Sequence, residues 1–513
     1  MRHPWELVTN GVGVCCLVGS LLIPIGGCGG DDRAPACKSG TDCGLGGTTS
    51  SSGTGGEGAG GGSTSSAVKW VKVFGDDAAQ LATSVALDSQ GNIFVAGHYS
   101  GMMAFDEEQF PENTAHDIFL AKLDPAGAVL WIHPFGQNGA APGPQDEINV
   151  AVDSEDNVVV TSAIVGDTSI GLDTPAIFQQ QGNQEALFAA KLTGDGGFLW
   201  ATMIGSGGTD VTARGVDCDA DGNVYVAGDV IGDGISFQGT IINLGAGGAF
   251  VVKLAHDTGM VTWARGYEHS SFNVVAQDIA VDSDGAAVVV GDFTGVLTLQ
   301  NGELTNIASG EGMTDIFLIK LAAADGAELW AKHYGSADGQ RLGHGVALDG
   351  QDHIHVAAAF FGQVDFGKGP HEVDGERYDP VVAKLNADTT CRWSVAVASP
   401  EHQRPLGIDV GSDNQVVVAG LFQLEMNWTV PALATKGNDD IFVAQLDSEG
   451  MLDWARGIGG LGQQWATDVA VADDGTVVFV GWSDGDIELT GDILENAGGR
   501  DVVIGSIDGN APQ

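Results

Sequence analysis

A similar unit recurs seven times along this chain, and the repetition constrains the fold more than any other feature. Each unit begins with a tryptophan, and successive tryptophans are separated by 61 to 69 residues. The seven are Trp70, Trp131, Trp200, Trp263, Trp330, Trp393 and Trp454. Repetition at a near-constant period is typical of architectures in which similar units pack side by side. Most of the chain therefore belongs to one repeat architecture.

Each unit contains four short pieces that have the pattern of β-strands. In the first, Trp70–Gly75, the tryptophan and an aromatic residue lie four positions apart and share one face of a strand. The second, such as Ile148–Val152, alternates apolar and polar residues and ends at a polar turn such as Ser89–Asn92. The third, such as Val224–Gly228, is apolar on both faces, and Asp117–Leu123 typifies the fourth. No stretch shows sustained helical periodicity.

Four strands per unit and seven units predict an all-β fold, a seven-bladed β-propeller with four antiparallel strands per blade. A small sheet cannot bury both of its faces alone, but sheets packed around a circle cover one another. We expect each tryptophan strand to lie outermost in the preceding blade. The strand of Trp70 then closes the last blade, which is built from residues after Trp465, and this closure removes the free sheet edges.

The wording of the units resembles the bacterial seven-bladed propeller repeats called SBBP repeats. The segments Asp88–Gly97, Asp117–Asp124 and Trp131–Gly136 carry the resemblance, which extends over residues 68–508. It implies a propeller in a secreted or surface protein. Because those repeats occur mostly in proteins of unassigned role, the resemblance implies no activity.

Two units depart from the pattern. Asp352–His355 replaces the usual Gly-Asn turn, and Val397–Ala398 replaces the aromatic-Gly pair. His353 and His355 would share one face of a strand. No third metal ligand accompanies them, so we interpret both as packing or surface residues.

The N-terminal residues have the pattern of an export signal. Arg2 gives a short basic start, and the apolar stretch 11–25 is too short and too rich in glycine for a good membrane-spanning helix. The stretch ends before Cys28 in a sequence that resembles a bacterial lipobox. This resemblance implies that residues 1–27 are a lipoprotein signal peptide, that Cys28 is lipidated, and that Gly29 directs the chain to the outer membrane. The alternative is an ordinary cleaved secretion signal without lipid.

A flexible tether is expected between this signal and the propeller. Residues 44–66 are almost wholly Gly, Ser, Thr and Ala, and such a segment cannot bury enough apolar area to offset its ordering entropy. We therefore assign residues 28–67 to a tether, 68–508 to the propeller and 509–513 to a tail.

Cysteine spacing indicates no zinc site. Cys37 and Cys43 flank a short loop and could form a local disulfide in an oxidising envelope. Cys218 and Cys391 lie in different units, and we interpret both as buried free thiols.

The charge of the chain excludes nucleic acid as a partner. Lys and Arg total 21 against 68 Asp and Glu, a formal net charge of −47. Nucleic-acid binding depends on neutralising phosphates, which an acidic protein repels. The partner is therefore expected to be a protein or a glycan of unknown identity, with membrane contact through the N-terminal lipid.

The sequence indicates no cofactor, with one short motif that could bind Ca²⁺ as the exception. Asp217, Asp219 and Asp221 precede Gly222, and alternate carboxylates before a glycine turn can converge on a hard cation. The closing glutamate of such loops is absent, since Gly228 stands in its place. The alternative is a hairpin turn with solvated aspartates.

The sequence contains no recognisable catalytic constellation. The segment 254–259 with Trp263 resembles the tryptophan-docking repeat of quinoprotein dehydrogenases, which are eight-bladed propellers that bind pyrroloquinoline quinone. Seven units and the lack of adjacent cysteines in the propeller favour a general propeller feature instead. Lysines recur near the end of the fourth piece, where we expect each to pair with an acid or cover a blade face with its stem. They are Lys122, Lys191, Lys253, Lys320 and Lys384.

These observations favour a non-catalytic binding module, exported and lipid-anchored at the outer membrane, facing either the periplasm or the surface. The variable insertions 101–115, 166–184 and 295–314 are the expected partner contacts, since loops on a rigid scaffold commonly carry function. The alternatives are an envelope enzyme of quinoprotein or hydrolase type, and a structural coat protein. Clustered acids with shifted pKa values at the central channel would favour the enzyme.

Overall fold

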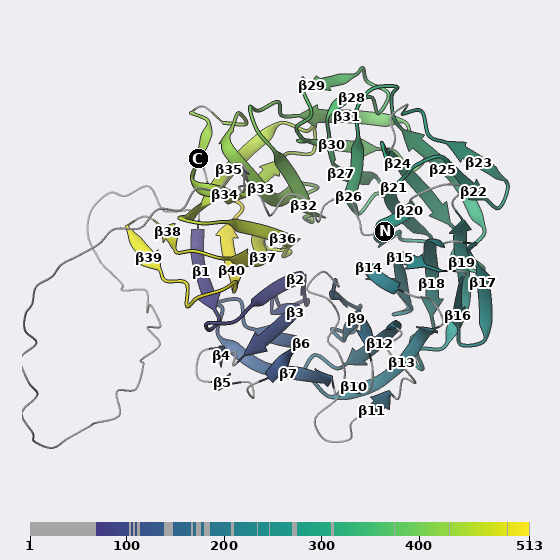
Figure 1. The fold of residues 1–513 in the computed structure, drawn as a ribbon, viewed down its shortest axis with the longest axis horizontal. Coiled ribbons are helices and arrows are strands. Elements are labelled where there is room, and N and C mark those ends of the chain that lie inside the picture. Colours follow the sequence, from purple (N-terminus) through teal and green to yellow (C-terminus); the bar gives the residue numbers. More distant parts are fainter. Residues whose placement is uncertain are drawn as a thin grey trace, which may run out of the picture. The chain divides into compact units, whose positions relative to one another are not determined.

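A computed structural model shows a ring of seven β-sheets around a central axis (Figure 1). The structure describes residues 68–511 apart from short gaps, among them 138–146, 179–184 and 269–273. The described residues form strands and turns and contain no helix, and therefore no helix that is long and apolar enough to cross a membrane. The predicted all-β, seven-bladed propeller is confirmed.

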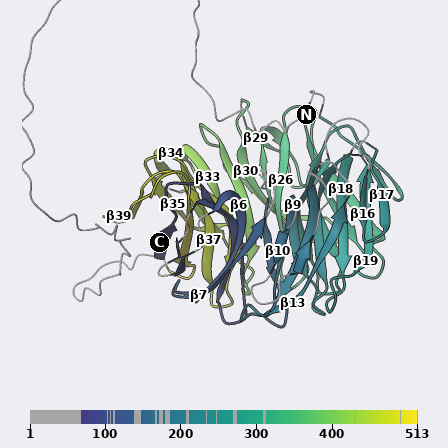
Figure 2. The ribbon, with the colours of Figure 1, turned by 60° about the horizontal axis from the view of Figure 1, so that its bottom comes forward.

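Each blade contains four antiparallel strands, which run between the two faces of the ring (Figure 2). From innermost to outermost they are β2 (Gln80–Leu87), β3 (Ile93–Gly101), β6 (Asn113–Leu123) and β7 (Val129–Gln137) in blade 1; β8 (Asn149–Val152), β9 (Val158–Val165), β12 (Glu185–Leu192) and β13 (Phe198–Ser206) in blade 2; β14 (Asp210–Cys218), β15 (Val224–Ile231), β18 (Gly247–Leu254) and β19 (Val261–Glu268) in blade 3; β20 (Val274–Val281), β21 (Ala287–Phe293), β24 (Asp315–Leu321) and β25 (Glu328–Tyr334) in blade 4; β26 (Arg341–Leu348), β27 (Ile354–Phe360), β30 (Asp379–Leu385) and β31 (Cys391–Ala396) in blade 5; β32 (Gln403–Val410), β33 (Val416–Met426), β34 (Leu433–Leu446) and β35 (Leu452–Gly460) in blade 6; and β36 (Gln464–Val471), β37 (Thr476–Ser483), β40 (Asp501–Asp508) and β1 (Val68–Phe74) in blade 7.

The N-terminal strand closes the ring as predicted. Strand β1 pairs antiparallel with β40, with Trp70 opposite Ser506 and Phe74 opposite Val502. The tryptophan strand is thus the outermost strand of the preceding blade in every unit. The first and last strands of the described chain lie in one sheet, so the ring has no open end.

The core lies between neighbouring blades, because each second strand is apolar on both faces. Phe94 and Ala96 of β3 pack with Val160 of blade 2. Between them in sequence, Val95 points the other way and packs with Val480 of blade 7. All five side chains are fully buried. Burying such a side chain contributes roughly 1.5–3 kcal/mol, which explains the dense β-branched runs in the sequence.

The recurrent tryptophans link each blade to the next. Trp131 donates its indole N–H to the Gly194 carbonyl at 3.1 Å, and Trp454 donates to the Gly509 carbonyl at 3.0 Å. The carbonyls belong to the turn between the third and fourth strands of the next blade, or follow its third strand. A glycine at positive φ in these turns lies directly against the ring, as Gly196 does against Trp131.

The insertions between second and third strands extend the outer edge of the ring. They form the short hairpins β4 (Ala104–Phe105) with β5 (Glu108–Gln109), β10 (Thr168–Ile170) with β11 (Ala176–Phe178), β16 (Gly234–Phe237) with β17 (Thr240–Asn243), β22 (Val296–Leu299) with β23 (Gly302–Thr305), β28 (Gly362–Val364) with β29 (His371–Val373), and β38 (Ile487–Leu489) with β39 (Asp492–Leu494). Three of them pair with the outermost strand of the preceding blade: β10 with β7, β16 with β13, and β38 with β35. One of the three insertions that we expected to contact a partner, 166–184, therefore also joins two blades.

Candidate functional site

The ring has two faces with different chemistry. On the turn face lie the short turns that follow the first and third strands of each blade. On the loop face the first strands begin and the second strands end, and the longer connections lie there. We describe the turn face first, because most of the charged residues singled out by the sequence lie on it.

Five blades carry a buried ion pair at the turn face, between an aspartate that follows the first strand and the recurrent lysine of the third strand. The pairs are Asp88–Lys122 at 2.9 Å, Asp153–Lys191 at 2.6 Å, Asp219–Lys253 at 3.0 Å, Asp282–Lys320 at 2.6 Å and Asp349–Lys384 at 2.9 Å. The expectation that each lysine pairs with a neighbouring acid is thus confirmed. In blades 6 and 7 Gln445 and Ser506 replace the lysine, and Gly411 and Ala472 occupy the aspartate position in the same turn. Both partners are replaced together, which indicates a structural pair.

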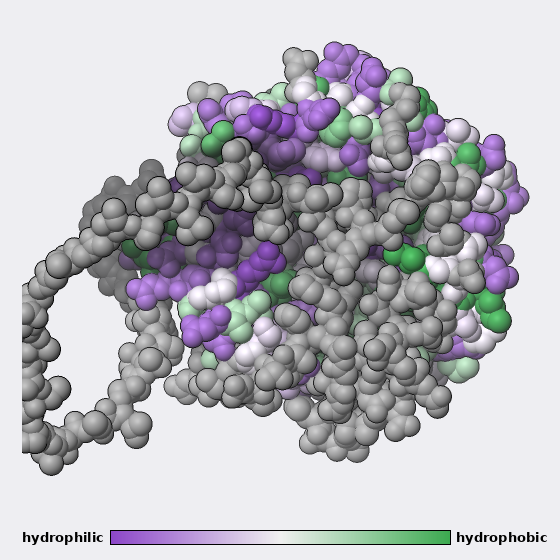
Figure 3. Space-filling model, viewed as in Figure 1, coloured by the Kyte–Doolittle hydropathy of each residue, from purple (hydrophilic) through white to green (hydrophobic). Residues whose placement is uncertain are grey.

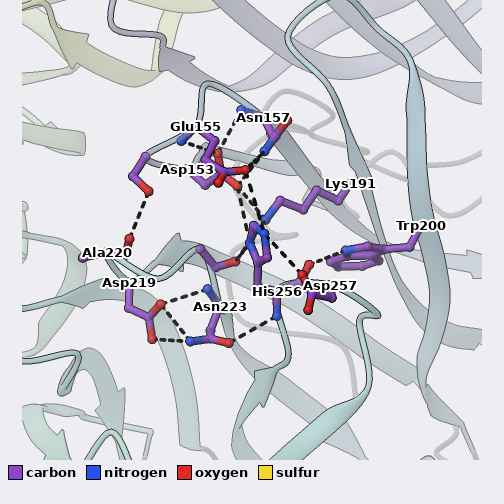
Figure 4. Close-up of polar contacts among 12 residues, drawn as sticks. Asp153, Glu155, Asn157, Lys191, Trp200, Asp219, Ala220, Asn223, His256 and Asp257 are labelled. Atoms are coloured by element: carbon purple, nitrogen blue, oxygen red, sulfur yellow. Dashed lines mark hydrogen bonds and ion pairs between the residues drawn. The ribbon is translucent and has the colours of Figure 1, made fainter.

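The densest group of titratable side chains on the turn face lies between blades 2 and 3 (Figure 4). The Lys191 ammonium lies between the Asp153 carboxylate and His256 Nδ1, which is 2.9 Å away. Burial acts to raise the pKa of Asp153, but hydrogen bonds from Lys191 and Asn157 outweigh it, so this pKa lies below its usual value. Lys191 is fully buried and hydrogen-bonded, so it has no access to a substrate.

The segment that resembles a quinoprotein repeat forms part of this group. Residues 254–259 include the turn on which Trp200 docks, with the indole N–H donating to the His256 carbonyl at 2.7 Å. Gly259 lies against the ring, so that a Cβ there would be 2.6 Å from Trp200 Cε3. The same docking occurs at other blades, so this resemblance reflects the packing of blades and identifies no cofactor contact.

The three aspartates predicted to bind Ca²⁺ make separate contacts. Asp217 accepts the backbone N–H groups of Cys218 and Val281, each at 2.7 Å. Asp219 pairs with Lys253, and Asp221 is exposed. Binding of one ion by all three would require Asp217 and Asp219 to leave these partners. Among the described residues no group of three acidic, histidine or cysteine side chains could hold a metal, and Ca²⁺ here stays a prediction.

The two histidines of the divergent turn share a carboxylate. His353 Nδ1 lies 2.9 Å from Asp349 Oδ2, and His355 Nε2 lies 3.3 Å from the same oxygen. Burial lowers the pKa of His355. For Asp349, burial acts to raise the pKa, but the hydrogen bonds that the carboxylate accepts outweigh burial and hold the pKa of Asp349 well below its usual range. Both histidines therefore have structural partners, in agreement with their interpretation as packing residues.

Four aspartates on the innermost strands share one role, which the sequence did not indicate, and three of them were not singled out by the sequence. Asp217, Asp278, Asp409 and Asp468 each accept the backbone N–H of the following residue and one backbone N–H from the first strand of the next blade. Asp468, for example, accepts from Val85 at 2.9 Å and joins blade 7 to blade 1. These carboxylates therefore connect first strands around the central axis.

Burial raises the pKa of all four inner carboxyls. The pKa is about 6 for Asp217 and Asp468 and about 7 for Asp409, and that of Asp278 is well above its usual value. Repulsion from neighbouring carboxylates adds to the shift at Asp217, Asp278 and Asp409. Groups that titrate near neutral pH can act as general acids or bases. Here, however, both oxygens of each carboxylate bind backbone N–H groups, which favours a structural role.

The loop face carries a group of side chains that does not repeat between blades. We call it the arginine–aromatic row, and its members are Tyr378, Arg404, Trp465, Trp482 and Arg500. The Arg404 guanidinium carbon lies 4.5 Å from the centre of the Tyr378 ring, and that of Arg500 lies 4.2 Å from the centre of the Trp482 ring. Trp465 and Trp482 contact each other with ring centres 5.0 Å apart.

A buried carboxylate connects the two halves of the row. Asp439 accepts the indole N–H of Trp465 at 2.9 Å, and it is held by an amide N–H of Gln423 at 2.8 Å. Burial lowers the pKa of Arg404. The negative charge of Asp439 acts to raise it, although the carboxylate lies too far from the guanidinium to form an ion pair. The row thus extends over blades 5 to 7 at the loop face.

The loop face of blades 3 and 4 has the opposite character. Arg214 is bound by two carboxylates, those of Asp229 and Glu147, with the Glu147 oxygen 3.0 Å away. Burial raises the pKa of Asp292 to about 7. The loop face of blades 2 to 4 therefore contains buried carboxylates, and one of them, Asp292, also acts on Tyr378 of the row.

The cysteine predictions divide between described and other residues. Cys218 and Cys391 are free thiols, as expected, but they are half-buried rather than buried. Cys28, Cys37 and Cys43 lie outside the described residues, as do the predicted signal peptide and tether.

Comparisons with known proteins agree with a propeller and add little about the site. No family model matches the chain. The uncharacterized WD repeat-containing protein L264 of Acanthamoeba polyphaga mimivirus is 23% identical over 515 residues, covering 82% of this chain and 36% of that protein. The chain thus spans about a third of the length of this relative.

Two solved structures illustrate the similarity in fold. Virginiamycin B lyase from Staphylococcus aureus overlaps 86% of this chain and 99% of its own, with a TM-score of 0.41 and 10% identity. Quinohemoprotein alcohol dehydrogenase from Comamonas testosteroni overlaps 87% and 77%, with a TM-score of 0.38 and 10% identity. Similarity this distant carries no argument about function, and the seven blades rest on the strand pairing of the chain itself.

Proposed function

We propose that this chain is a non-catalytic interaction module whose propeller binds a protein or glycan partner through its loop face. One observation carries the proposal. The charged residues that repeat from blade to blade are buried and paired, whereas the non-repeating arginines of the arginine–aromatic row keep open hydrogen-bonding capacity. The propeller fold and the WD-repeat relative support an interaction role.

Affinity capture from cell-envelope extracts tests this proposal, with the purified chain as bait. We expect a saturable partner that is retained by the unmodified chain and by Arg456→Gln but released by Arg404→Gln. Arg456 is a matched control, because its guanidinium also lies over a tryptophan, Trp454 at 5.7 Å, but on the outermost strand of blade 6. Absence of any saturable partner would contradict the proposal.

We also propose that the module is a lipoprotein of the outer membrane. The lipobox-like sequence before Cys28, the tether composition of residues 44–66 and the resemblance of Asp88–Gly97 to SBBP repeats support this location. Cys28→Ser should move the protein from the detergent phase to the aqueous phase in a detergent partition assay. Unchanged partitioning would contradict lipid attachment at Cys28.

An enzymatic role is the second candidate, and the inner carboxyls are the observation that favours it. Clustered acids with shifted pKa values are what we expected of an enzyme, and the pKa values of these carboxyls are raised. Their hydrogen bonds to backbone N–H groups nevertheless favour a structural role. Assaying hydrolysis of envelope polysaccharides by the purified chain and by Asp409→Asn tests it. Turnover that Asp409→Asn abolishes while the variant stays folded would favour the enzyme over the module.

A further inference from the structure

Positive charge is scarce in this chain, and the two arginines of the row are the least satisfied of the described arginines. Lys and Arg number 21 against 68 Asp and Glu. Most described arginines donate to a carboxylate, a carbonyl or a side chain, as Arg265 does to the Gly326 carbonyl. Among the described residues, Arg404 and Arg500 are the arginines whose guanidinium groups have neither a hydrogen bond nor an ion pair with another described residue.

The aromatic rings hold these guanidinium groups in place without using their donors. Arg404 lies over Tyr378, and Arg500 lies over Trp482. Both arginines are half-buried, so part of each side chain is removed from water. A guanidinium carries five N–H donors in a fixed fork, and stacking on a ring leaves this fork open at its edge. The open edges match the two oxygens of a carboxylate.

The composition of the row is that of a protein interface. Trp, Tyr and Arg are the residue types that dominate binding hot spots, and the arginine–aromatic row contains only these. The described surface visible in Figure 3 is largely hydrophilic, with small separate hydrophobic patches, so a broad apolar contact does not compete with the row on that view.

Charge complementarity limits where an acidic partner can dock. With a net charge of −47, most of the molecule repels an acidic segment. The row is the exception. Repulsion elsewhere therefore adds specificity to attraction at the row.

We infer that the arginine–aromatic row docks an acidic peptide segment of a partner protein, whose carboxylates bind the open N–H groups of Arg404 and Arg500. The inference rests on the proposed interaction role and names the chemistry of its ligand. The apolar parts of the segment would lie against Trp465 and Tyr378, which are half-buried.

Fluorescence anisotropy with defined probes tests the inference on the purified chain. The probe is a fluorescein-labelled peptide of alternating glutamate and glycine, and the control peptide has glutamine in place of glutamate. We expect binding of the glutamate probe alone, with affinity falling as salt increases. Arg404→Gln and Arg500→Gln should each weaken it at least about tenfold, since a hydrogen bond to a charged group is worth that much. Arg456→Gln should leave it unchanged.

Three results of the peptide assay would overturn the inference, and one result of the affinity capture would do so as well. One is no binding of the glutamate probe at millimolar protein, and another is an equal loss in Arg456→Gln. The third is tighter binding of a labelled oligogalacturonate through the same two arginines, which would make the row a glycan site. Retention of an envelope partner by the Arg404→Gln, Arg500→Gln double variant would overturn this inference while leaving the interaction module intact.

Discussion

The two faces of the ring use charge in opposite ways. On the turn face, Asp153 and Lys191 are wholly buried against each other, and equivalents recur in five blades. On the loop face, Arg404 and Arg500 occur once each, stack on aromatic rings and form no ion pair with a described carboxylate. In a repeat protein, residues that recur maintain the blades, whereas charged residues that depart from the repeat are the candidates for function. Four experiments test this contrast.

The largest effect is expected from breaking one pair on the turn face. Lys191→Met leaves the buried Asp153 carboxylate without its cation and should lower the free energy of unfolding by about 3–5 kcal/mol. Denaturant unfolding measures this. Adding Asp153→Ala should recover most of the loss, because blades 6 and 7 lack both partners. A double variant as unstable as the single one would contradict a paired role.

The docking turns should also be sensitive. Gly259 has a φ of +64° and no room for a Cβ beside Trp200, so Gly259→Ala adds a clash to a backbone strain of about 1–2 kcal/mol. Gly312 is the control, because it has a φ of +78° with nothing within 4 Å of its Cβ position. Thermal unfolding should show a larger loss for Gly259→Ala than for Gly312→Ala. Equal losses would mean that Trp200 adjusts without cost.

The carboxyls of the inner strands predict an unusual pH dependence. A carboxyl whose pKa is raised in the folded state binds its proton more tightly there, so its contribution to stability is present at low pH and lost as pH rises through the folded value. For Asp409 that value is about 7, against about 4 unfolded. The paired Asp153, whose pKa is lowered, has the opposite sign and loses stability only in acid. Stability should therefore fall between pH 5 and pH 8, by order-of-magnitude linkage.

The variant Asp409→Asn isolates this contribution. It removes one titrating group, so unfolding measured across that pH range should fall less steeply, whatever its effect at a single pH. Asp257→Asn, at a side chain that is 87% exposed, should leave the slope unchanged. The same slope in Asp409→Asn and in the unmodified chain would show that this carboxyl does not titrate there.

The smallest effect on stability is expected for the two arginines of the arginine–aromatic row. Arg404→Gln and Arg500→Gln remove a cation–π contact but no ion pair or hydrogen bond to another described residue, so each should lower the free energy of unfolding by no more than about 1 kcal/mol. Denaturant unfolding beside the binding assay checks this. A large loss of stability would place the row with the structural residues of the turn face.

The fold could be predicted from sequence because its determinants repeat. The tryptophan spacing gave the blade number, the outermost position of that strand and the closure by β1. The pairing of Lys122 with an acid also followed, since lysine recurs at one position. These features depend on short sequence patterns that occur in all or most of the seven units, so their repetition makes them recognisable.

The inner carboxyls and the row were missed for different physical reasons. Each inner strand has an irregularity in register just before the carboxyl positions, as between Ala276 and Asp278, so simple alternation misassigns the faces. The recurrence of aspartate on first strands was nevertheless a usable signal. The row joins strand ends of three blades, from Tyr378 to Arg500, and its members share no motif. The packing of blades 5 to 7 against one another brings them together.

Closure of the ring by β1 also determines how the domain would respond to tension. Any pull transmitted through the residues before Val68 enters the ring at β1, whose neighbour in the sheet is β40. That seam joins the first described strand to the last one, so it cannot form until β40 has been synthesised, and it is the first contact to bear such a load. Under such a load the ring would open at blade 7, and β40 would lose its partner strand before any other strand does.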